Sequence, residues 1–154
     1  MWQLISGIFL GWSLGTNDAA NVFGTAVASR MVKFWTAAIL CSFFVVLGAL
    51  LEGQEGIETY RQLSPMSPNL AFIVGAAAGG TVALMSFFKL PVSTSQAVVG
   101  ALVLIGIMNS NLDPSSLIKV VVCWVATPIG AALITVVLYY IVGKLMNLFR
   151  MSLF

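Results

Sequence analysis

Five long apolar segments, separated by short polar stretches, constrain this chain more than any other feature of its sequence. Hydrophobic residues make up 60 % of the 154 residues and charged residues only 8 %, a balance far from that of soluble domains. A helix needs about 20 apolar residues to cross the hydrocarbon core of a bilayer. The sequence therefore predicts an all-α membrane protein, and the lipid bilayer is its first expected partner.

The five segments are of two kinds. Three are long enough for ordinary transmembrane helices, and these are residues 34–51, 70–88 and 117–148. The last contains Pro128, which a transmembrane helix tolerates as a kink. Polar residues interrupt the other two segments, 2–28 and 91–108, so we expect both to be broken or re-entrant. The first reads as two half-helices, and the second is too short to cross the membrane alone. Residues 1–154 are expected to form a single transmembrane repeat unit.

Lys and Arg residues near the ends of the segments predict how the chain is oriented, because positive charge favours the cytoplasmic side. With the N-terminus outside, five of the seven basic residues face the cytoplasm, namely Arg30, Lys33, Lys89, Lys144 and Arg150. Arg61 and Lys119 then face outward. We expect an integral membrane protein, in the cell (inner) membrane, with its C-terminus in the cytoplasm. A signal peptide at the N-terminus is disfavoured because no basic residue precedes Arg30.

Several functional classes are disfavoured by what the sequence lacks. The net charge of +2 is small and scattered, so no basic face for nucleic acid is expected. There is no histidine, and Cys41 and Cys123 lie apart in apolar runs, where packing is the expected role. An intramembrane hydrolase would need a base beside Ser93 or Ser95, and none is evident. The chain is therefore not expected to be an enzyme.

The first interrupted segment contains the polar stretch GTNDAANVFGT at residues 15–25. On a helix, Asn17, Asp18, Asn21 and Thr25 lie at spacings that bring them to neighbouring positions on one face. Asp18 is the only acid within an apolar segment, and such a charge is costly unless an ion or a partner compensates it. Carboxylate, amide and hydroxyl oxygens suit Na⁺ or another hard cation, or a proton could neutralise the acid. A purely structural role, in which Asp18 caps a half-helix, remains the alternative.

The second interruption, PVSTSQAVVGA at residues 91–101, has the complementary polarity. Ser93 followed by Gln96 is a capping-box pattern that predicts a helix start at Ser93 or Thr94. Free N–H groups at that helix end, joined by the hydroxyls of Ser93, Thr94 and Ser95 and the amide of Gln96, would suit an anion rich in oxygen atoms. The alternative is a capped helix that simply follows a loop.

These two stretches together resemble the paired signatures of the inorganic phosphate transporter family, secondary transporters that move phosphate with Na⁺ or H⁺. Family members usually read G-A-N-D-V-A-N-A at the first motif, so Thr16, Ala19 and Val22 are departures, while Asn17, Asp18, Ala20 and Asn21 match. The resemblance implies that Asp18 and Asn21 belong to the cation-linked site, with Asn17 and Thr25 as further candidates. It also implies that Ser93, Thr94, Ser95 and Gln96 lie at the phosphate.

Gln96 bears on the choice of coupling ion. Many members of the family have a histidine at this position, and its replacement by glutamine removes a group that titrates near neutral pH. The departure favours Na⁺ over H⁺, although H⁺ coupling stays open. No other cofactor is expected. Sulfate or another tetrahedral oxyanion, and an uncoupled anion channel, remain alternatives to phosphate symport.

Each signature occurs once in this chain, whereas the resemblance implies two copies in two inverted halves that build one central site. We therefore expect the chain to form one inverted repeat of a secondary transporter. Its expected partners are inorganic phosphate and a second inverted half, either fused or separate. The sequence alone leaves open whether the chain is a fragment, a subunit or one copy of an antiparallel dimer.

Overall fold

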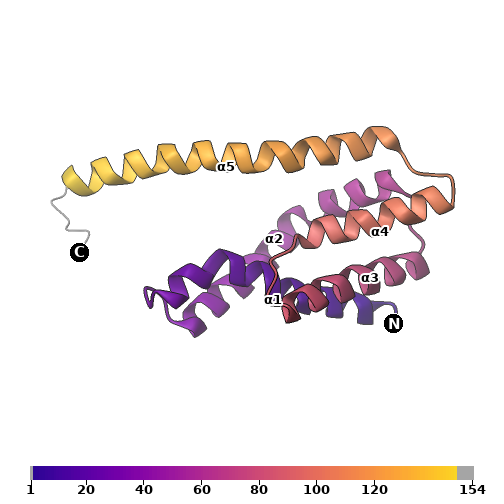
Figure 1. The fold of residues 1–154 in the computed structure, drawn as a ribbon, viewed down its shortest axis with the longest axis horizontal. Helices are drawn as coiled ribbons and strands as arrows, with labels where there is room; N and C mark the ends of the chain where they lie inside the picture. Colours follow the sequence, from indigo (N-terminus) through magenta and orange to yellow (C-terminus); the bar gives the residue numbers. More distant parts are fainter. Residues whose placement is uncertain (1, 149–154) are drawn as a thin grey trace. The chain divides into compact units, whose positions relative to one another are not determined.

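The computed structural model describes residues 2–148, which form α-helices and no strands (Figure 1). The helices are α1 (Leu4–Ala28), α2 (Phe34–Leu63), α3 (Pro68–Phe87), α4 (Thr94–Met108) and α5 (Pro114–Leu148). Helices α2, α3 and α5 are long and apolar enough to cross a membrane, which agrees with the three ordinary spans. The all-α membrane architecture is therefore confirmed. The chain divides into two units, residues 1–113 with α1 to α4 and residues 114–154 with α5.

Helix α1 is continuous, and the expectation of two half-helices in residues 2–28 is wrong. A helix breaks where a backbone hydrogen bond is lost, as at proline, and the polar stretch at its centre contains no proline. Thr16 instead donates its hydroxyl to the carbonyl oxygen of Ser13, 2.9 Å away within the same helix. Asn17 finds partners on other elements. The polar side chains are thus accommodated without interrupting the helix.

Helix α2 is longer than the expected span of residues 34–51, because it continues to Leu63. The added part, residues 52–63, contains three Glu, two Gln, one Leu and one Arg, and all of these are strong helix formers. The drop in hydropathy after Leu51 therefore does not coincide with the end of the helix.

Helices α3 and α4 both begin at a serine cap. The Ser67 hydroxyl accepts the Leu70 N–H at 3.3 Å, and the Ser93 hydroxyl accepts the Gln96 N–H at the same distance. The predicted helix start at Ser93 or Thr94 is therefore confirmed. At 15 residues, α4 is only about 22 Å long, so this segment is the short helix that the sequence indicated.

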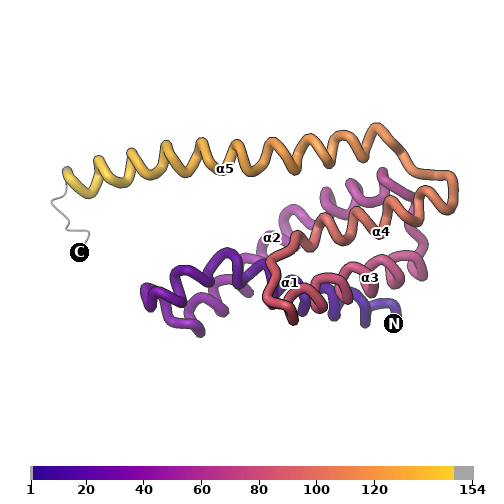
Figure 2. The backbone as a smooth tube through the Cα atoms, in the orientation of Figure 1, coloured from indigo at the N-terminus to yellow at the C-terminus, as the bar shows by residue number. Residues whose placement is uncertain are grey.

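The loop between α3 and α4 starts with a sharp turn. Lys89 has a positive φ of 60°, and the Leu90 N–H donates to the Met85 carbonyl oxygen at 2.9 Å. This is the pattern of a Schellman ending, in which a left-handed residue reverses the chain after a helix. Figure 2 shows the tube leaving α3 and crossing α1 before it enters α4. The loop therefore brings the start of α4 to the middle of α1.

Helix α1 packs most extensively on α3, which in turn packs on α4. The close approach depends on two glycines of α3, since a Cβ at Gly75 would lie 3.0 Å from the Ser6 hydroxyl and one at Gly79 would lie 2.9 Å from the Phe9 ring. The hydroxyl of Ser13, which is 0 % exposed, donates across the same interface to the Gly79 carbonyl oxygen at 3.0 Å. Small residues and interhelical hydrogen bonds of this kind are typical of helix packing in lipid.

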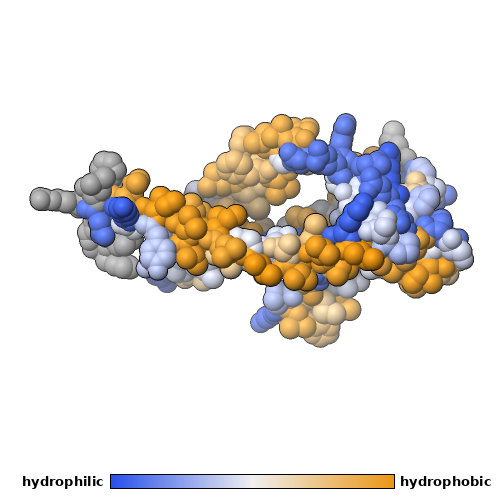
Figure 3. Space-filling model, turned by 90° about the horizontal axis from the view of Figure 1, so that it is seen from above, coloured by the Kyte–Doolittle hydropathy of each residue, from blue (hydrophilic) through white to orange (hydrophobic). Residues whose placement is uncertain are grey.

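The polarity of α1 is the reverse of that in a soluble helix. Its buried residues are Ser6, Ser13 and Asn17, whereas large apolar side chains such as Ile8 and Trp12 are exposed. Figure 3 shows hydrophobic residues along extended stretches of the visible face, with hydrophilic residues gathered into separate patches. For α1, a buried face with small polar residues and an exposed apolar face are expected where lipid is the solvent.

Helix α5 is described by itself, as the second unit. It starts at Pro114 and runs without a break through Pro128, as the sequence allowed. Its hydrophobic side chains are largely exposed, and its length and composition suit a full membrane crossing.

Candidate functional site

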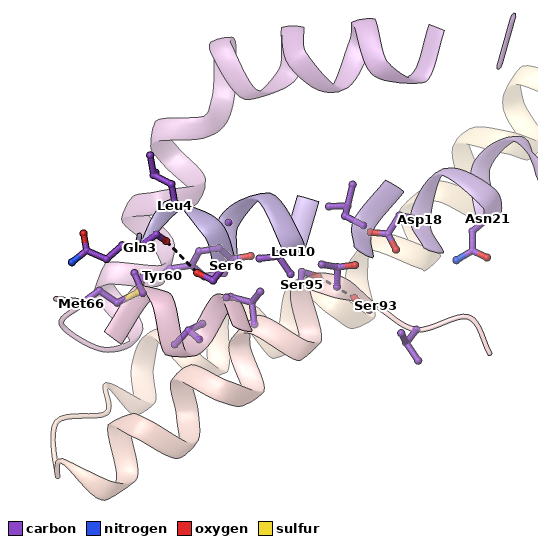
Figure 4. A pocket seen from close by; sticks show the side chains of 18 of the residues that line it. Gln3, Leu4, Ser6, Leu10, Asp18, Asn21, Tyr60, Met66, Ser93 and Ser95 are labelled. Carbon is purple, nitrogen blue, oxygen red and sulfur yellow. Dashed lines mark hydrogen bonds between the residues drawn. The ribbon is translucent and has the colours of Figure 1, made fainter. Parts of the chain in front are cut away.

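A cleft of about 1040 Å³ opens in the first unit, between α1, the end of α2, the start of α3 and the start of α4. Most of its lining is apolar, with polar side chains collected at two places (Figure 4). A concave site with few, convergent polar groups is the usual form of a small-molecule site.

Asp18 and Asn21 line one end of this cleft, from the middle of α1. They are three residues apart, so both belong to the same face of the helix. Asp18 is half-buried, and within residues 2–148 no hydrogen bond or salt bridge to its carboxylate is found. The Asn21 amide nitrogen donates to Asn17 at 3.3 Å, which leaves the Asn21 amide oxygen as the group that it can offer to a cation.

Ser93, Thr94 and Ser95 line the same cleft from the N-terminus of α4. Figure 4 shows Ser93 and Ser95 near Asp18, and their two hydroxyl oxygens are 3.0 Å apart. Thr94 is only 5 % exposed, and its hydroxyl is buried without a hydrogen-bond partner. A buried polar group without a partner is costly. The N-terminus of α4 thus offers hydroxyls, backbone N–H groups and the positive end of a helix dipole.

Asn17 belongs to the same motif as Asp18, but its side chain has different surroundings. It lines a separate, smaller hollow of about 190 Å³ beside the loop between α3 and α4. Its amide nitrogen donates to the Ser86 hydroxyl at 3.0 Å and to the Leu90 carbonyl oxygen at 3.3 Å. Its amide oxygen accepts the Val92 N–H at 3.2 Å and the Asn21 amide at 3.3 Å.

The two remaining predicted site residues, Thr25 and Gln96, do not line the large cleft. Both are exposed. Thr25 lies about two helical turns beyond Asp18 on α1. The Gln96 N–H bonds the Ser93 cap, whereas its side chain is outside the lining. The structure therefore brings together five of the eight predicted residues in one cleft, namely Asp18, Asn21, Ser93, Thr94 and Ser95.

The far end of the cleft contains polar residues that sequence reasoning missed. Gln3, Ser6 and Tyr60 lie there together, as Figure 4 shows. Gln3 is the N-cap of α1 and Ser6 lies in its first turn. The spacing of Ser6, Ser13 and Asn17 along one helical face was a signal that could have indicated a polar interior side. Tyr60 carried no such signal, because it follows the apolar part of α2.

Comparison with known proteins decides the family. A family model described as the phosphate transporter family matches residues 14–153. The chain belongs to the phosphate transporter family. This is a family of transporters and not of enzymes, as the sequence led us to expect.

Individual relatives carry similar names. The sodium-dependent phosphate transporter 1 of Mus musculus is 34 % identical over 161 residues, which cover 92 % of this chain and 23 % of the relative. A putative phosphate permease of Methanocaldococcus jannaschii is 32 % identical over 133 residues, which cover 85 % of this chain and 43 % of the relative. The chloroplastic inorganic phosphate transporter 2-1 of Arabidopsis thaliana is 31 % identical over 149 residues, which cover 88 % of this chain and 25 % of the relative. This chain thus spans less than half the length of these relatives. No solved structure is significantly similar to it.

Proposed function

We propose that this chain supplies half of the site of a membrane transporter that moves inorganic phosphate together with Na⁺. One observation carries the proposal: a single cleft is lined both by Asp18 and Asn21 and by the N-terminus of α4. The first pair suits a cation and the second suits an oxyanion. Their proximity would let the bound cation offset the charge of the anion, which is the basis of symport at a shared site.

In the proposed site, Ser93, Thr94 and Ser95 donate hydrogen bonds to phosphate. The Thr94 hydroxyl, which has no hydrogen-bond partner within the protein, would then be satisfied by the anion. Asp18 provides the negative charge for Na⁺, and Asn21 adds a neutral oxygen. Gln96 and Thr25 are secondary candidates, because neither lines the cleft. Na⁺ is preferred over H⁺ because the chain has no histidine and because one relative is named a sodium-dependent phosphate transporter.

The proposal includes the membrane arrangement that the basic residues favour. The N-terminus lies outside and the C-terminus lies in the cytoplasm of a cell membrane. The second, inverted half of the transporter, fused or separate, completes the site. Sulfate transport and an uncoupled anion channel are the competing functions.

The test is uptake of labelled phosphate into proteoliposomes that contain the assembled transporter, with and without an inward Na⁺ gradient at fixed pH. We expect uptake to depend on the gradient, and excess unlabelled sulfate to compete poorly. The Asp18→Asn variant, which has nearly the same shape without the charge, should fold normally and lose gradient-driven uptake. Equal uptake without the gradient would favour a channel, and normal Na⁺-dependent uptake by Asp18→Asn would remove Asp18 from the mechanism.

A further inference from the structure

Asn17 lies at the centre of a buried hydrogen-bond network that connects α1 to the loop before α4. The residue is 5 % exposed. Its amide nitrogen has two hydrogens, and these are donated to Ser86 and to Leu90. Its amide oxygen has two lone pairs, and these accept from Val92 and Asn21. The hydrogen-bonding capacity of this side chain is therefore fully used within the protein.

The pattern of partners requires a carboxamide in one orientation. The Leu90 carbonyl oxygen needs a donor and the Val92 N–H needs an acceptor. A flipped amide would set oxygen against oxygen, and an aspartate would do the same while burying a charge. With both lone pairs occupied, the Asn17 oxygen can bind a cation only by giving up these hydrogen bonds.

The partners of Asn17 lie on the elements that determine where α4 begins. Ser86 is in the last turn of α3, and its hydroxyl also donates to the Val82 carbonyl oxygen at 2.8 Å. Leu90 and Val92 are in the loop that ends at Ser93, the cap of α4. Within residues 2–148, the hydrogen bonds found between this loop and α1 all involve Asn17.

We infer that Asn17 is a positioning residue, which holds the loop of residues 88–93 against α1 and thereby fixes the N-terminus of α4 beside Asp18. Its consequence for phosphate rests on the proposed function, whereas its consequence for the loop does not. In this interpretation, two adjacent residues of the polar stretch 15–25 have different roles. Asp18 lines the large cleft. Asn17 lines the smaller hollow and holds in place the N-terminus of α4, which lines the large cleft from the other side.

The first test measures the loop directly, by hydrogen–deuterium exchange of the purified protein in detergent. In Asn17→Ala, the Val92 amide loses its acceptor, and we expect the segment containing residues 88–93 to exchange at least about tenfold faster, as for a lost hydrogen bond. Ser13→Ala is the matched control, because Ser13 is also buried on α1 and bonds Gly79 of α3 without touching the loop. Unchanged exchange in Asn17→Ala, or equal acceleration in Ser13→Ala, would overturn the inference.

Ser86→Ala provides a milder variant in case Asn17→Ala does not fold. It removes the acceptor of one Asn17 hydrogen but keeps the bonds to Leu90 and Val92. We expect exchange of the loop to be faster than in the wild type and slower than in Asn17→Ala. No change in the loop of Ser86→Ala would contradict the inference.

The second test separates a positioning residue from a cation ligand. If Asn17 were a cation ligand, the Asn17→Asp variant would keep an oxygen atom at the site and add charge, so Na⁺ would activate uptake at equal or lower concentration. As a positioning residue, Asn17→Asp loses both donors, and we expect the KM for phosphate to rise about tenfold or more together with faster exchange of the loop. Tighter activation by Na⁺ with an unchanged KM would overturn the inference.

The two tests also distinguish failure of this inference from failure of the proposed function. If the wild-type protein takes up no phosphate, the proposed function fails, but the exchange comparison between Asn17→Ala and Ser13→Ala still decides the role of Asn17. If uptake is normal and Asn17→Ala leaves the exchange of residues 88–93 unchanged, only the positioning role fails.

Discussion

Thr94 is the residue whose surroundings are hardest to explain by stability alone. Its hydroxyl is buried and has no hydrogen-bond partner, whereas four other threonines donate theirs to a backbone carbonyl of their own helix. Thr81, for example, donates to the Ala77 carbonyl oxygen at 2.9 Å. Thr94 lines the cleft at the N-terminus of α4, and an unsatisfied hydroxyl there is explained if a bound anion becomes its partner.

This view predicts opposite effects of Thr94→Val on stability and on binding. Valine has nearly the same shape and lacks the hydroxyl, so thermal unfolding in detergent should show stability unchanged or raised by roughly 1 kcal/mol. The KM for phosphate should rise at least about fivefold, because a hydrogen bond to a charged ligand is lost. Thr81→Val is the control, and it should leave the KM unchanged. A Thr94→Val protein that is destabilised and binds phosphate normally would show that the hydroxyl is structural.

Among the helices, the contact between α1 and α3 is the one that positions both polar motifs, and it depends on close approach at Gly79. A Cβ there would lie 2.9 Å from a Phe9 ring atom and 3.3 Å from the Leu10 Cα. The ring could turn aside, but the backbone of α1 could not move without separating the helices.

We therefore predict that Gly79→Ala destabilises the protein by about 1 to 3 kcal/mol, the usual cost of overpacking. Gly80→Ala is a matched control on the next residue, because a Cβ there meets nothing within 4 Å. It should be neutral or stabilising by up to about 1 kcal/mol, since alanine favours helix more than glycine does. Thermal unfolding of the two variants measures the difference. Equal stabilities would mean that the contact between α1 and α3 is looser than the structure indicates.

The elements also show which features the sequence could predict. The start of α4 was predictable because its signal is local: Ser93 caps Gln96 three residues later. The unbroken course of α1 was not, because the partners that satisfy Asn17 lie 69 and 73 residues away, at Ser86 and Leu90. Hydropathy located the apolar part of α2 but not its end at Leu63, since helix propensity continues where hydrophobicity stops.

At the scale of the whole molecule, the large cleft leaves polar groups on an open face. Asp18 and the N-terminus of α4 line it, and hydrocarbon can satisfy neither a carboxylate nor free backbone N–H groups. Gly7, Gly11 and Gly15 form a stripe on α1, and a Cβ at any of them would meet nothing within 4 Å. Such a stripe allows another helix to approach closely, and within the first unit no helix does so.

We predict that this chain transports phosphate only when a second, inverted half covers the cleft. In transporters built from repeats, the substrate site lies at the interface between the repeats, so one unit alone would provide an incomplete site. A distinct second half is favoured over an antiparallel copy of the same chain. The basic residues favour one orientation by five to two, and an inverted copy would insert against that bias.

The measurement compares this chain expressed alone with the chain expressed beside an inverted half from a relative of the same family. We expect the chain alone to show no phosphate uptake, and coexpression to produce both a larger particle in nanodiscs and Na⁺-dependent uptake. Gly11→Leu should leave the isolated chain folded, because the space at this position is open, but it should prevent assembly if the stripe is the contact. Uptake by a monomer of this chain alone would refute the shared site, because the cleft of a single unit would then suffice for binding and translocation.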